Sequence, residues 1–551
     1  MPIRSLYADV TIPDVLFHHL LLRAANSIAE HNPDKKAFIN GAHPDDYLTF
    51  GQLKEHSSAV AQFLHNAGFV KQTACTVLSN CHQFAPFFLG VSAQGGALSG
   101  APAHLTEYEL SCQLKATACT VVLTDANHLD LVMRTAKEST SLKTVIVVGS
   151  SAAKLPPSST DGPRYFTWDE VIATKVDTTR SPVTINPVED VVLLPFSSGT
   201  TGRPKGVMLT HRNFVAMFCM MGGFVAQATS EERVKMMDWP KDHFLIVSPI
   251  FHISGFTQLC WSLLRGATSI ILDDFEPRLF LSTIQKYKIP LVSVSPAILS
   301  SLVKSPLLKE FDISCIKKVI TGAAPTGKEL IDSAKAALPD VLCFEQGYGM
   351  TELTIAATLP SPKSRVKTGT VGKLLPNLEI KILDSSTGGE LPSGKAGELC
   401  VRGPTLMKGY LGLPEATKDT IRDGWLHTGD VAFFDDDGDL FIVDRLKELI
   451  KVKGLQVSPA ELEDLLLSNE RITDVAVIGV PDEEAGELPK AFVVRADASL
   501  TEEEVADFVA AKTSKFKHLK GGVEFVDSIP RTPTGKILRK ELRGRCNKNY
   551  L

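Results

Sequence analysis

The chain has 551 residues, with 58 Lys and Arg against 63 Asp and Glu and a formal net charge of −5. With 44% hydrophobic and 22% charged residues, it has the composition of a globular protein of several domains. Mild acidity without long charged runs argues against a nucleic-acid surface or a polybasic membrane anchor as the main function. Small molecules are therefore the expected partners.

The cysteines and the termini indicate a cytoplasmic protein. The ten cysteines are scattered, with no C-x-x-C pair and no zinc-ligand spacing, which predicts reduced thiols. The N-terminus lacks the apolar run of a secretory signal. The apolar stretch 84–103 contains Pro86 and Gly95-Gly96, which predicts a buried helix and no transmembrane segment. The last three residues, Asn549-Tyr550-Leu551, match a peroxisomal S-K-L address poorly.

Short β-rich runs alternate with amphipathic segments over the first two thirds of the chain. This alternation is typical of parallel sheets covered by helices, so the fold class is α/β. The expected strands are 119–123, 144–148, 191–196, 244–247, 269–272, 291–294 and 318–320, and the clearest helices are 49–66 and 328–338.

The pattern changes after about residue 369, where Gly- and Pro-punctuated strands predict a β-rich subdomain. Its clearest strands are 378–383, 397–402 and a hairpin of 433–434 with 440–443 that turns at Asp-Gly. A charged stretch follows, and then an α+β pattern with a helix beginning at Ser458-Pro459, strands 475–480, 491–495 and 523–526, and a helix 501–513. We expect a large N-terminal domain, residues 1–444, of two α/β subdomains plus the β-rich subdomain, and a small C-terminal domain, residues 445–551.

The most informative segment runs from Val191 to Asn213. A predicted buried strand leads into a loop that can bring backbone N–H groups and hydroxyls to an anion, Ser197-Ser198-Gly199-Thr200-Thr201-Gly202. Lys205 adds a charge suited to a phosphate. Gly206 follows it, so the segment is not a Walker P-loop. A Gly/Ser-rich loop by itself is more typical of a polar turn, but the whole string with Pro-Lys-Gly is far more specific.

This segment resembles the adenylate-forming acyl-CoA synthetases, a family that includes 4-coumarate-CoA ligases and beetle luciferases. Other segments resemble the family in its order over nearly the whole chain: PIFHISG (249–255), TGAAP (321–325), EQGYGMTE (345–352), GYLGLPEAT (409–417), DGWLHTGD (423–430), VDRLKELIKVKGLQVSPAELE (443–463) and PRTPTGKILRKELR (530–543). The resemblance implies a ligase in which a carboxylate attacks the α-phosphorus of Mg²⁺-ATP to give an acyl-adenylate and pyrophosphate. The thiol of coenzyme A then displaces AMP.

The resemblance also implies roles for individual residues. The nucleotide-binding set is Ser197, Ser198, Gly199, Thr200, Thr201, Lys205, Gln346, Gly347, Tyr348, Asp430 and Arg445, with Thr351 on phosphate and Glu352 on Mg²⁺. His252 orients the carboxylate or gates its pocket, and Lys536 contacts the acyl-adenylate oxygens. Taken singly, such a His more often packs in a core and such a Lys is more often solvated.

The acyl pocket is expected to include Ser254, Gly322, Ala323 and Gly349. These small residues leave room for an elongated apolar acid, which fits fatty acids and hydroxycinnamates equally.

One lysine does not explain how one site performs two reactions. The resemblance implies a hinge at 444–447 that moves the small domain after adenylation and withdraws Lys536. Lys451, Lys453 and Gly454 then face the thiol and coenzyme A. Lys447 and Gln456 complete the expected cofactor-binding set.

Two other functions stay open on the sequence, and a third is disfavoured by it. A luciferase-like oxygenase and an adenylation enzyme that loads a carrier protein share the first half-reaction. A non-enzymatic binding module would be expected to lack Lys205, Glu352, Asp430 or Lys536, and all four are present.

Overall fold

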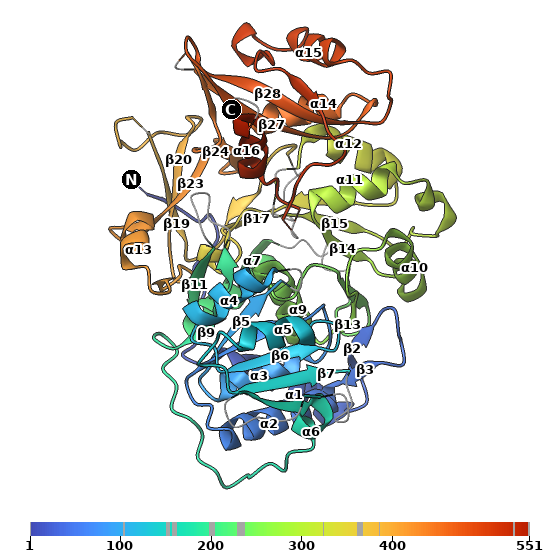
Figure 1. Ribbon diagram of the computed structural model, residues 1–551, viewed down its shortest axis with the longest axis vertical. Helices are drawn as coiled ribbons and strands as arrows, with labels where there is room; N and C mark the ends of the chain where they lie inside the picture. Colours follow the sequence, from blue (N-terminus) through green and yellow to red (C-terminus); the bar gives the residue numbers. More distant parts are fainter. Residues whose placement is uncertain are drawn as a thin grey trace.

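The computed structural model describes residues 2–102, 105–149, 155–156, 162–197, 204–228, 237–322, 324, 326–360, 367–384, 386–453, 455–532 and 535–548. Figure 1 shows a large body of α/β and β-rich layers with a small C-terminal domain at one end. This confirms the expected α/β fold with a large N-terminal part and a small α+β C-terminal part. No helix in the described ranges is long and apolar enough to cross a membrane.

The first α/β layer is a sheet with strand order β10-β11-β9-β5-β4-β6-β7-β8, parallel from β9 to β8. Its strands are β4 Thr73–Val77, β5 Ala97–Ala101, β6 Val121–Asp125, β7 Thr144–Val148, β8 Arg164–Thr167, β9 Val191–Leu193, β10 Phe196–Ser197 and β11 Lys205–Thr210. The helices are α1 Phe17–His31, α2 Phe50–Asn66, α3 Phe84–Ala93, α4 Glu107–Ala116, α5 Leu129–Ala136, α6 Trp168–Ile172 and α7 His211–Ala228.

Local signals explain where these elements begin and end. Thr49 and Gln52 form a capping box at the start of α2. The expected single helix over 84–103 is wrong, because α3 ends at Ala93 and the chain continues as strand β5. Gly95, at φ +69°, makes the turn between them.

The second α/β layer combines β2 (Lys36–Asn40), β12 (His243–Ile246) and β13 (Thr268–Ile271), all parallel, with the antiparallel β3 (Tyr47–Thr49). Strand β12 contacts β14, which begins a parallel sheet. That sheet contains β14 Leu291–Val294, β15 Lys318–Thr321 and β16 Cys343–Gln346, and the helices of this layer are α9 Ile253–Arg265, α10 Pro277–Tyr287, α11 Pro296–Lys304 and α12 Lys328–Ala337.

The β-rich part is an antiparallel sheet with strand order β1-β19-β20-β23-β22, and β24 pairs with β23. The predicted hairpin is confirmed, with Gly438 at φ +76° in its turn. The bounds are β1 Ile3–Arg4, β19 Glu379–Leu383, β20 Gly397–Arg402, β22 Ile421–Arg422, β23 Trp425–Phe434 and β24 Leu440–Arg445, with β17 Thr358–Leu359, β18 Lys373–Leu374, β21 Gly409–Tyr410 and α13 Pro414–Thr420 nearby.

The C-terminal domain has its own buried apolar core. Its elements are β25 Ile450–Val452, β26 Leu455–Val457, α14 Pro459–Leu467, β27 Ile472–Asp482, β28 Gly486–Arg495, α15 Glu502–Ala510, β29 Val523–Phe525 and α16 Arg539–Lys548. Two of its contacts with the large body are made by polar side chains of α11 and α14. The ammonium of Lys304 donates to the carbonyls of Ile472 and Thr473, and the carboxylate of Asp464 accepts N–H groups in the first turn of α12.

Candidate active site

A cavity of about 2520 Å³ lies where the α/β layers, the β-rich part and the C-terminal domain meet. Its walls include α9, β14, β15 and the short helix Thr351–Leu353. Four residues of the C-terminal domain also line it, Arg531, Thr532, Gly535 and Lys536. Pockets for one drug-sized ligand are roughly 300–1,000 Å³. This cavity is therefore large enough for more than one substrate.

Glu352 forms the centre of a polar group at one end of the cavity. Its Oε1 accepts hydrogen bonds from the Ser197 hydroxyl at 3.2 Å and from the Tyr410 hydroxyl at 2.9 Å. The ammonium of Lys205 lies 4.7 Å from the centroid of the Tyr410 ring. Burial, followed by the charge of Glu352, raises the pKa of Tyr410. Tyr410 was not among the predicted site residues, although it lies in the quoted segment 409–417.

Strand pairing brings this group together. The β10–β11 pair sets Ser197 opposite Lys205, and β21 pairs with β11 and so places Tyr410 beside them. The predicted loop residues Ser198, Gly199, Thr200 and Thr201 lie outside the described residues.

Glu352 fits a Mg²⁺ ligand. Its side chain is buried and accepts hydrogen bonds from the neutral hydroxyls of Ser197 and Tyr410. In the part of the chain that the structure describes, no Lys or Arg forms an ion pair with it. Mg²⁺ in nucleotide enzymes is commonly held by one or two carboxylates together with substrate phosphates. Thr351, on the same short helix, lines the cavity.

A second polar group joins Tyr348, Asp430 and Arg445. The Tyr348 hydroxyl donates to Asp430 Oδ2 at 2.6 Å, and Arg445 Nε lies 3.0 Å from Asp430 Oδ1. The β23–β24 register sets Asp430 directly opposite Arg445. Burial and the adjacent Asp430 carboxylate raise the pKa of Tyr348 well above its usual range. Each carboxylate oxygen of Asp430 makes one of these contacts. A carboxylate can accept about four hydrogen bonds in all, so Asp430 can still accept hydrogen bonds from a ribose diol.

Lys536 reaches the same cavity from the C-terminal domain. Its loop is closed by the Thr532 N–H, which donates to the Lys536 carbonyl at 2.8 Å, and by the Lys536 N–H, which donates to the Thr532 hydroxyl at 3.1 Å. Burial, followed by the positive charge of Arg445, lowers the pKa of Lys536 to about 8. Two cations thus face one enclosed space, an arrangement suited to an anionic ligand.

His252 is both a helix cap and a cavity residue. It is the N-cap of α9, and its Nδ1 accepts the Ser254 N–H at 3.3 Å and lies 2.9 Å from the Ser254 hydroxyl. Burial lowers the pKa of His252 to about 4, so the ring is neutral near pH 7. With Nδ1 accepting, the remaining proton is on Nε2. Ser254 therefore fixes the tautomer of His252.

The predicted small residues differ in their surroundings. Gly322 and Gly347 line the cavity, and a Cβ at Gly322 would meet open space. Gly349 also lines the cavity, but a Cβ there would lie 1.6 Å from the Ile355 carbonyl, so the close approach is to the chain itself. Gln346 ends β16 and is not a lining residue, and Ala323 lies outside the described residues.

The other predicted cations of the C-terminal domain are not in the cavity. Lys447, Lys451, Lys453 and Gln456 are exposed, and no described residue between 446 and 530 lines the cavity. The ammonium of Lys453 pairs with Glu484, which raises the pKa of Lys453. Gly454 lies outside the described residues.

Two polar residues that the sequence reasoning missed lie in the cavity wall. The Thr257 hydroxyl and Gln258 Oε1 are buried, and among the described residues neither atom has a hydrogen-bond partner. The other amide atom of Gln258, Nε2, donates to the hydroxyls of Ser248 and Ser293. Both residues are on α9, about one and a half turns after His252. Only the packing of α9 against the cavity distinguishes them from ordinary helix residues.

Comparisons with known proteins agree with this architecture. The AMP-binding enzyme model matches residues 26–411, and the model of the AMP-binding enzyme C-terminal domain matches residues 461–536. The chain is 40% identical to 4-coumarate–CoA ligase 2 of Nicotiana tabacum, over 98% of this chain and 96% of that one, and 39% identical to 4-coumarate–CoA ligase of Pinus taeda, over 98% and 97%. The ATP-bound structure of MatB from Rhodopseudomonas palustris superimposes with a TM-score of 0.82 at 26% identity, covering 97% of this chain and all of the other. The chain belongs to the AMP-binding enzyme family.

Proposed function

We propose that this ATP-dependent acid–CoA ligase acts on an elongated apolar acid that carries a hydroxyl group, the hydroxycinnamate class. The general reaction, acid–thiol ligation through an acyl-adenylate, follows from the relationship to 4-coumarate–CoA ligases over nearly the full chain. The choice among acids is supported by one feature of the cavity, the unpaired polar atoms of Thr257 and Gln258.

A buried polar atom without a partner costs roughly 1–3 kcal/mol, so its presence in a ligand cavity favours a ligand that completes it. A phenolic hydroxyl both donates and accepts. The unpaired atoms of Gln258 and Thr257 have almost no accessible surface in this structure, so the two side chains would rotate toward the cavity to pair with that hydroxyl. The alkyl chain of a simple fatty acid would leave both unpaired. The nearby lining residues Ile320 and Val294 and the open space at Gly322 suit the apolar part of the acid.

Adenylation is assigned to the groups around Glu352 and Lys536. Mg²⁺ held at Glu352 would neutralise charge on the phosphates of ATP. Lys205, Arg445 and Lys536 supply the remaining positive charge that two reacting anions require. Neutral His252 offers its Nε2 proton to the acid carboxylate, which holds the nucleophile without adding a charge. Asp430 accepts from the ribose and Tyr348 lies beside it.

Thioester formation is assigned to a second arrangement of the C-terminal domain. Asp444 supports a boundary at this point, because it lies one residue before the end of the pairing with β23 and its carboxylate accepts from the Ser458 hydroxyl at 2.5 Å and the Ala460 N–H at 3.1 Å. Residues 1–444 and 445–551 then move as two bodies about 444–447. The movement withdraws Lys536 and brings Lys451, Lys453, Gly454 and Gln456 to coenzyme A.

The substrate assignment is tested with matched acids. Pyrophosphate release should be measured with 4-coumarate, with cinnamate, which lacks only the hydroxyl, and with a saturated fatty acid, each with and without coenzyme A. We expect kcat/KM for 4-coumarate to exceed that for cinnamate by roughly 5- to 150-fold, the equivalent of about 1–3 kcal/mol. Gln258→Leu should reduce this ratio toward one while cinnamate keeps its wild-type rate.

Other outcomes would identify a different function. Equal kcat/KM for 4-coumarate and cinnamate in the wild type would exclude the hydroxyl-binding role of Gln258. A preference for the fatty acid would exclude the hydroxycinnamate class. Adenylation without any thioester on addition of coenzyme A would favour the carrier-loading or oxygenase alternatives.

A further inference from the structure

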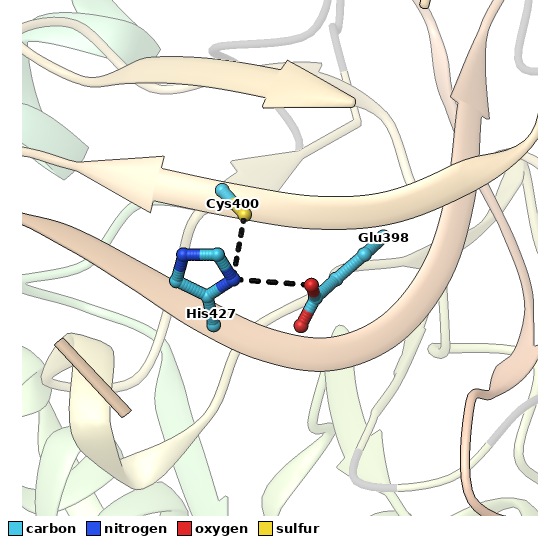
Figure 2. A group of neighbouring side chains, drawn as sticks. All are labelled: Glu398, Cys400 and His427. Carbon is cyan, nitrogen blue, oxygen red and sulfur yellow. Dashed lines mark hydrogen bonds and ion pairs between the residues drawn. The ribbon is translucent and has the colours of Figure 1, made fainter. Parts of the chain in front are cut away.

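Three side chains with metal-binding groups meet on the β-rich sheet, away from the cavity. Figure 2 shows Glu398 and Cys400 of β20 facing His427 of β23. His427 Nδ1 lies 3.4 Å from Cys400 Sγ and 3.1 Å from Glu398 Oε2, and all three ligand atoms lie within 4.8 Å of one another. Linear spacing did not predict this group, because its members come from two strands.

Sheet geometry holds the three groups together without a ligand. Cys400 and His427 are cross-strand partners in the β20–β23 pair, and Glu398 lies two residues before Cys400 on the same face. The intervening Leu399 and the adjacent Val401 point to the buried core on the other face. Cys400 is fully buried, whereas the side chains of His427 and Glu398 are 12% and 18% exposed. Solvent can therefore reach the group from the imidazole and carboxylate side.

Two of the three distances between ligand atoms are close to those of a tetrahedral zinc site, and the third, from Cys400 Sγ to Glu398, is no more than 4.8 Å. Zinc lies about 2.3 Å from thiolate sulfur and about 2.0–2.2 Å from imidazole nitrogen and carboxylate oxygen. Tetrahedral angles then place nitrogen about 3.6 Å from sulfur and about 3.4 Å from oxygen. The observed 3.4 and 3.1 Å differ from these values by only a few tenths of an ångström, which a small side-chain rotation provides.

Hydrogen bonds alone do not satisfy the group well. If Nδ1 of His427 carries a proton, it donates that proton to the Glu398 carboxylate and cannot accept the thiol proton of Cys400. If Nδ1 is unprotonated, it accepts from the thiol, but its lone pair then faces the lone pairs of the carboxylate. One cation bound to all three atoms removes this conflict. The thiol proton then leaves to solvent, and His427 binds as neutral imidazole with its proton on Nε2.

We propose that Glu398, Cys400 and His427 bind one thiophilic divalent cation of the zinc class, with water as the fourth ligand. The site links β20 to β23 and lies three residues before Asp430 on β23. It differs in chemistry from Glu352, because sulfur and imidazole ligands select zinc-like ions and an all-oxygen site selects Mg²⁺.

The test uses the full chain freed of metal by a chelator. Co²⁺ is titrated as a spectroscopic probe, because a cobalt–thiolate bond gives a charge-transfer band in the near ultraviolet, and Zn²⁺ is then added in competition. We expect one equivalent of Co²⁺, displaced by Zn²⁺ and not by excess Mg²⁺. Cys400→Ser should abolish the band. Loss of a residue that only hydrogen-bonds to a metal ligand lowers metal affinity by roughly 10- to 100-fold, so Glu398→Gln should weaken Zn²⁺ binding by at least that factor.

Matched variants keep the result interpretable. Cys219→Ser removes a partly buried cysteine on α7 and should leave the band unchanged. Glu398→Gln preserves size at a partly exposed position, so its circular dichroism should match the wild type even if Cys400→Ser is destabilised. Absence of a band in the wild type would overturn the proposal. So would a band that survives Cys400→Ser, or unchanged Zn²⁺ affinity in folded Glu398→Gln.

Discussion

Two parts of the C-terminal domain carry lysines assigned to the two half-reactions, and their environments are opposite. The loop ending at Lys536 lies in the cavity, where burial lowers the pKa of that lysine to about 8. The β25–β26 pair holds Lys451 and Gln456 opposite each other, both exposed and outside the cavity. One structure therefore places only one of the two lysines near the reacting atoms.

The proposed movement of the C-terminal domain would account for this difference. Lys451 and Lys536 belong to the same folded domain, so a rotation that exposes one can bury the other. The contacts that hold the present arrangement include polar ones, made by Lys304 to the carbonyls of Ile472 and Thr473 and by Asp464 at α12. Interfaces of this kind permit relative domain motion.

The largest expected effect is on Lys536. We predict that Lys536→Ala lowers acyl-adenylate formation by about 100- to 1,000-fold, as loss of one charge-stabilising donor does in other enzymes. It should still convert supplied acyl-adenylate to the thioester, and Lys451→Ala should show the reverse pattern. Single-turnover measurements of each half-reaction distinguish the two. Lys540→Ala, an exposed lysine on α16, is the control. Equal impairment of one half-reaction by both variants would favour a single fixed site.

The second prediction concerns pH. The Lys536 ammonium is charged below its pKa of about 8 and loses its charge as pH rises through that value. Adenylation kcat/KM, which reports groups of the free enzyme, should fall about tenfold per pH unit above pH 8. Lys536→Arg keeps its charge and should move this fall to higher pH. If kcat/KM of the Lys536→Arg variant still falls above pH 8, the pH dependence comes from a group other than Lys536.

The third prediction concerns Asp464, which accepts the N–H groups of Lys328 and Glu329 at the start of α12 across the domain boundary. The N-cap residue Gly327 supplies no side chain of its own. Capping is worth about 0.5–2 kcal/mol, so Asp464→Ala should slow adenylation by roughly 2- to 30-fold and spare thioester formation. Asp464→Asn can still cap the helix and should restore adenylation. If both half-reactions fall equally, Asp464 serves folding rather than domain position.

The smallest expected effect is on Lys453. Exposed ion pairs are worth about 0–1 kcal/mol, and Lys453 pairs with Glu484 far from the cavity lining. Lys453→Ala should change adenylation by less than about twofold and reduce only the thioester step. Glu484→Gln breaks the same pair and retains the lysine, so it separates loss of the pair from loss of the ammonium. A large adenylation defect in Lys453→Ala would contradict the assignment of this strand pair to the second step.

Local sequence patterns determined most of the elements. The strands 144–148, 291–294 and 397–402 were predicted with their observed bounds, and Ser458 caps α14 as its Ser-Pro-x-Glu pattern indicates. These signals are short-range, because periodicity, capping and turn residues act within a few positions. The prediction failed at 84–103, where Gly95 and the demands of the parallel sheet turn an apolar run into a helix and a strand.

The sequence by itself also determined the family and the reaction class, because contiguous motifs carry the resemblance. The roles of Glu352, Asp430 and Lys536 in those motifs stay predictions. Tertiary structure alone decided which of these groups meet. Strand register or helix packing brings together Tyr410 and Glu352, Gln258 with Ser248 and Ser293, Asp464 and α12, and the Glu398–Cys400–His427 group. Such contacts depend on long-range packing, which no local pattern encodes.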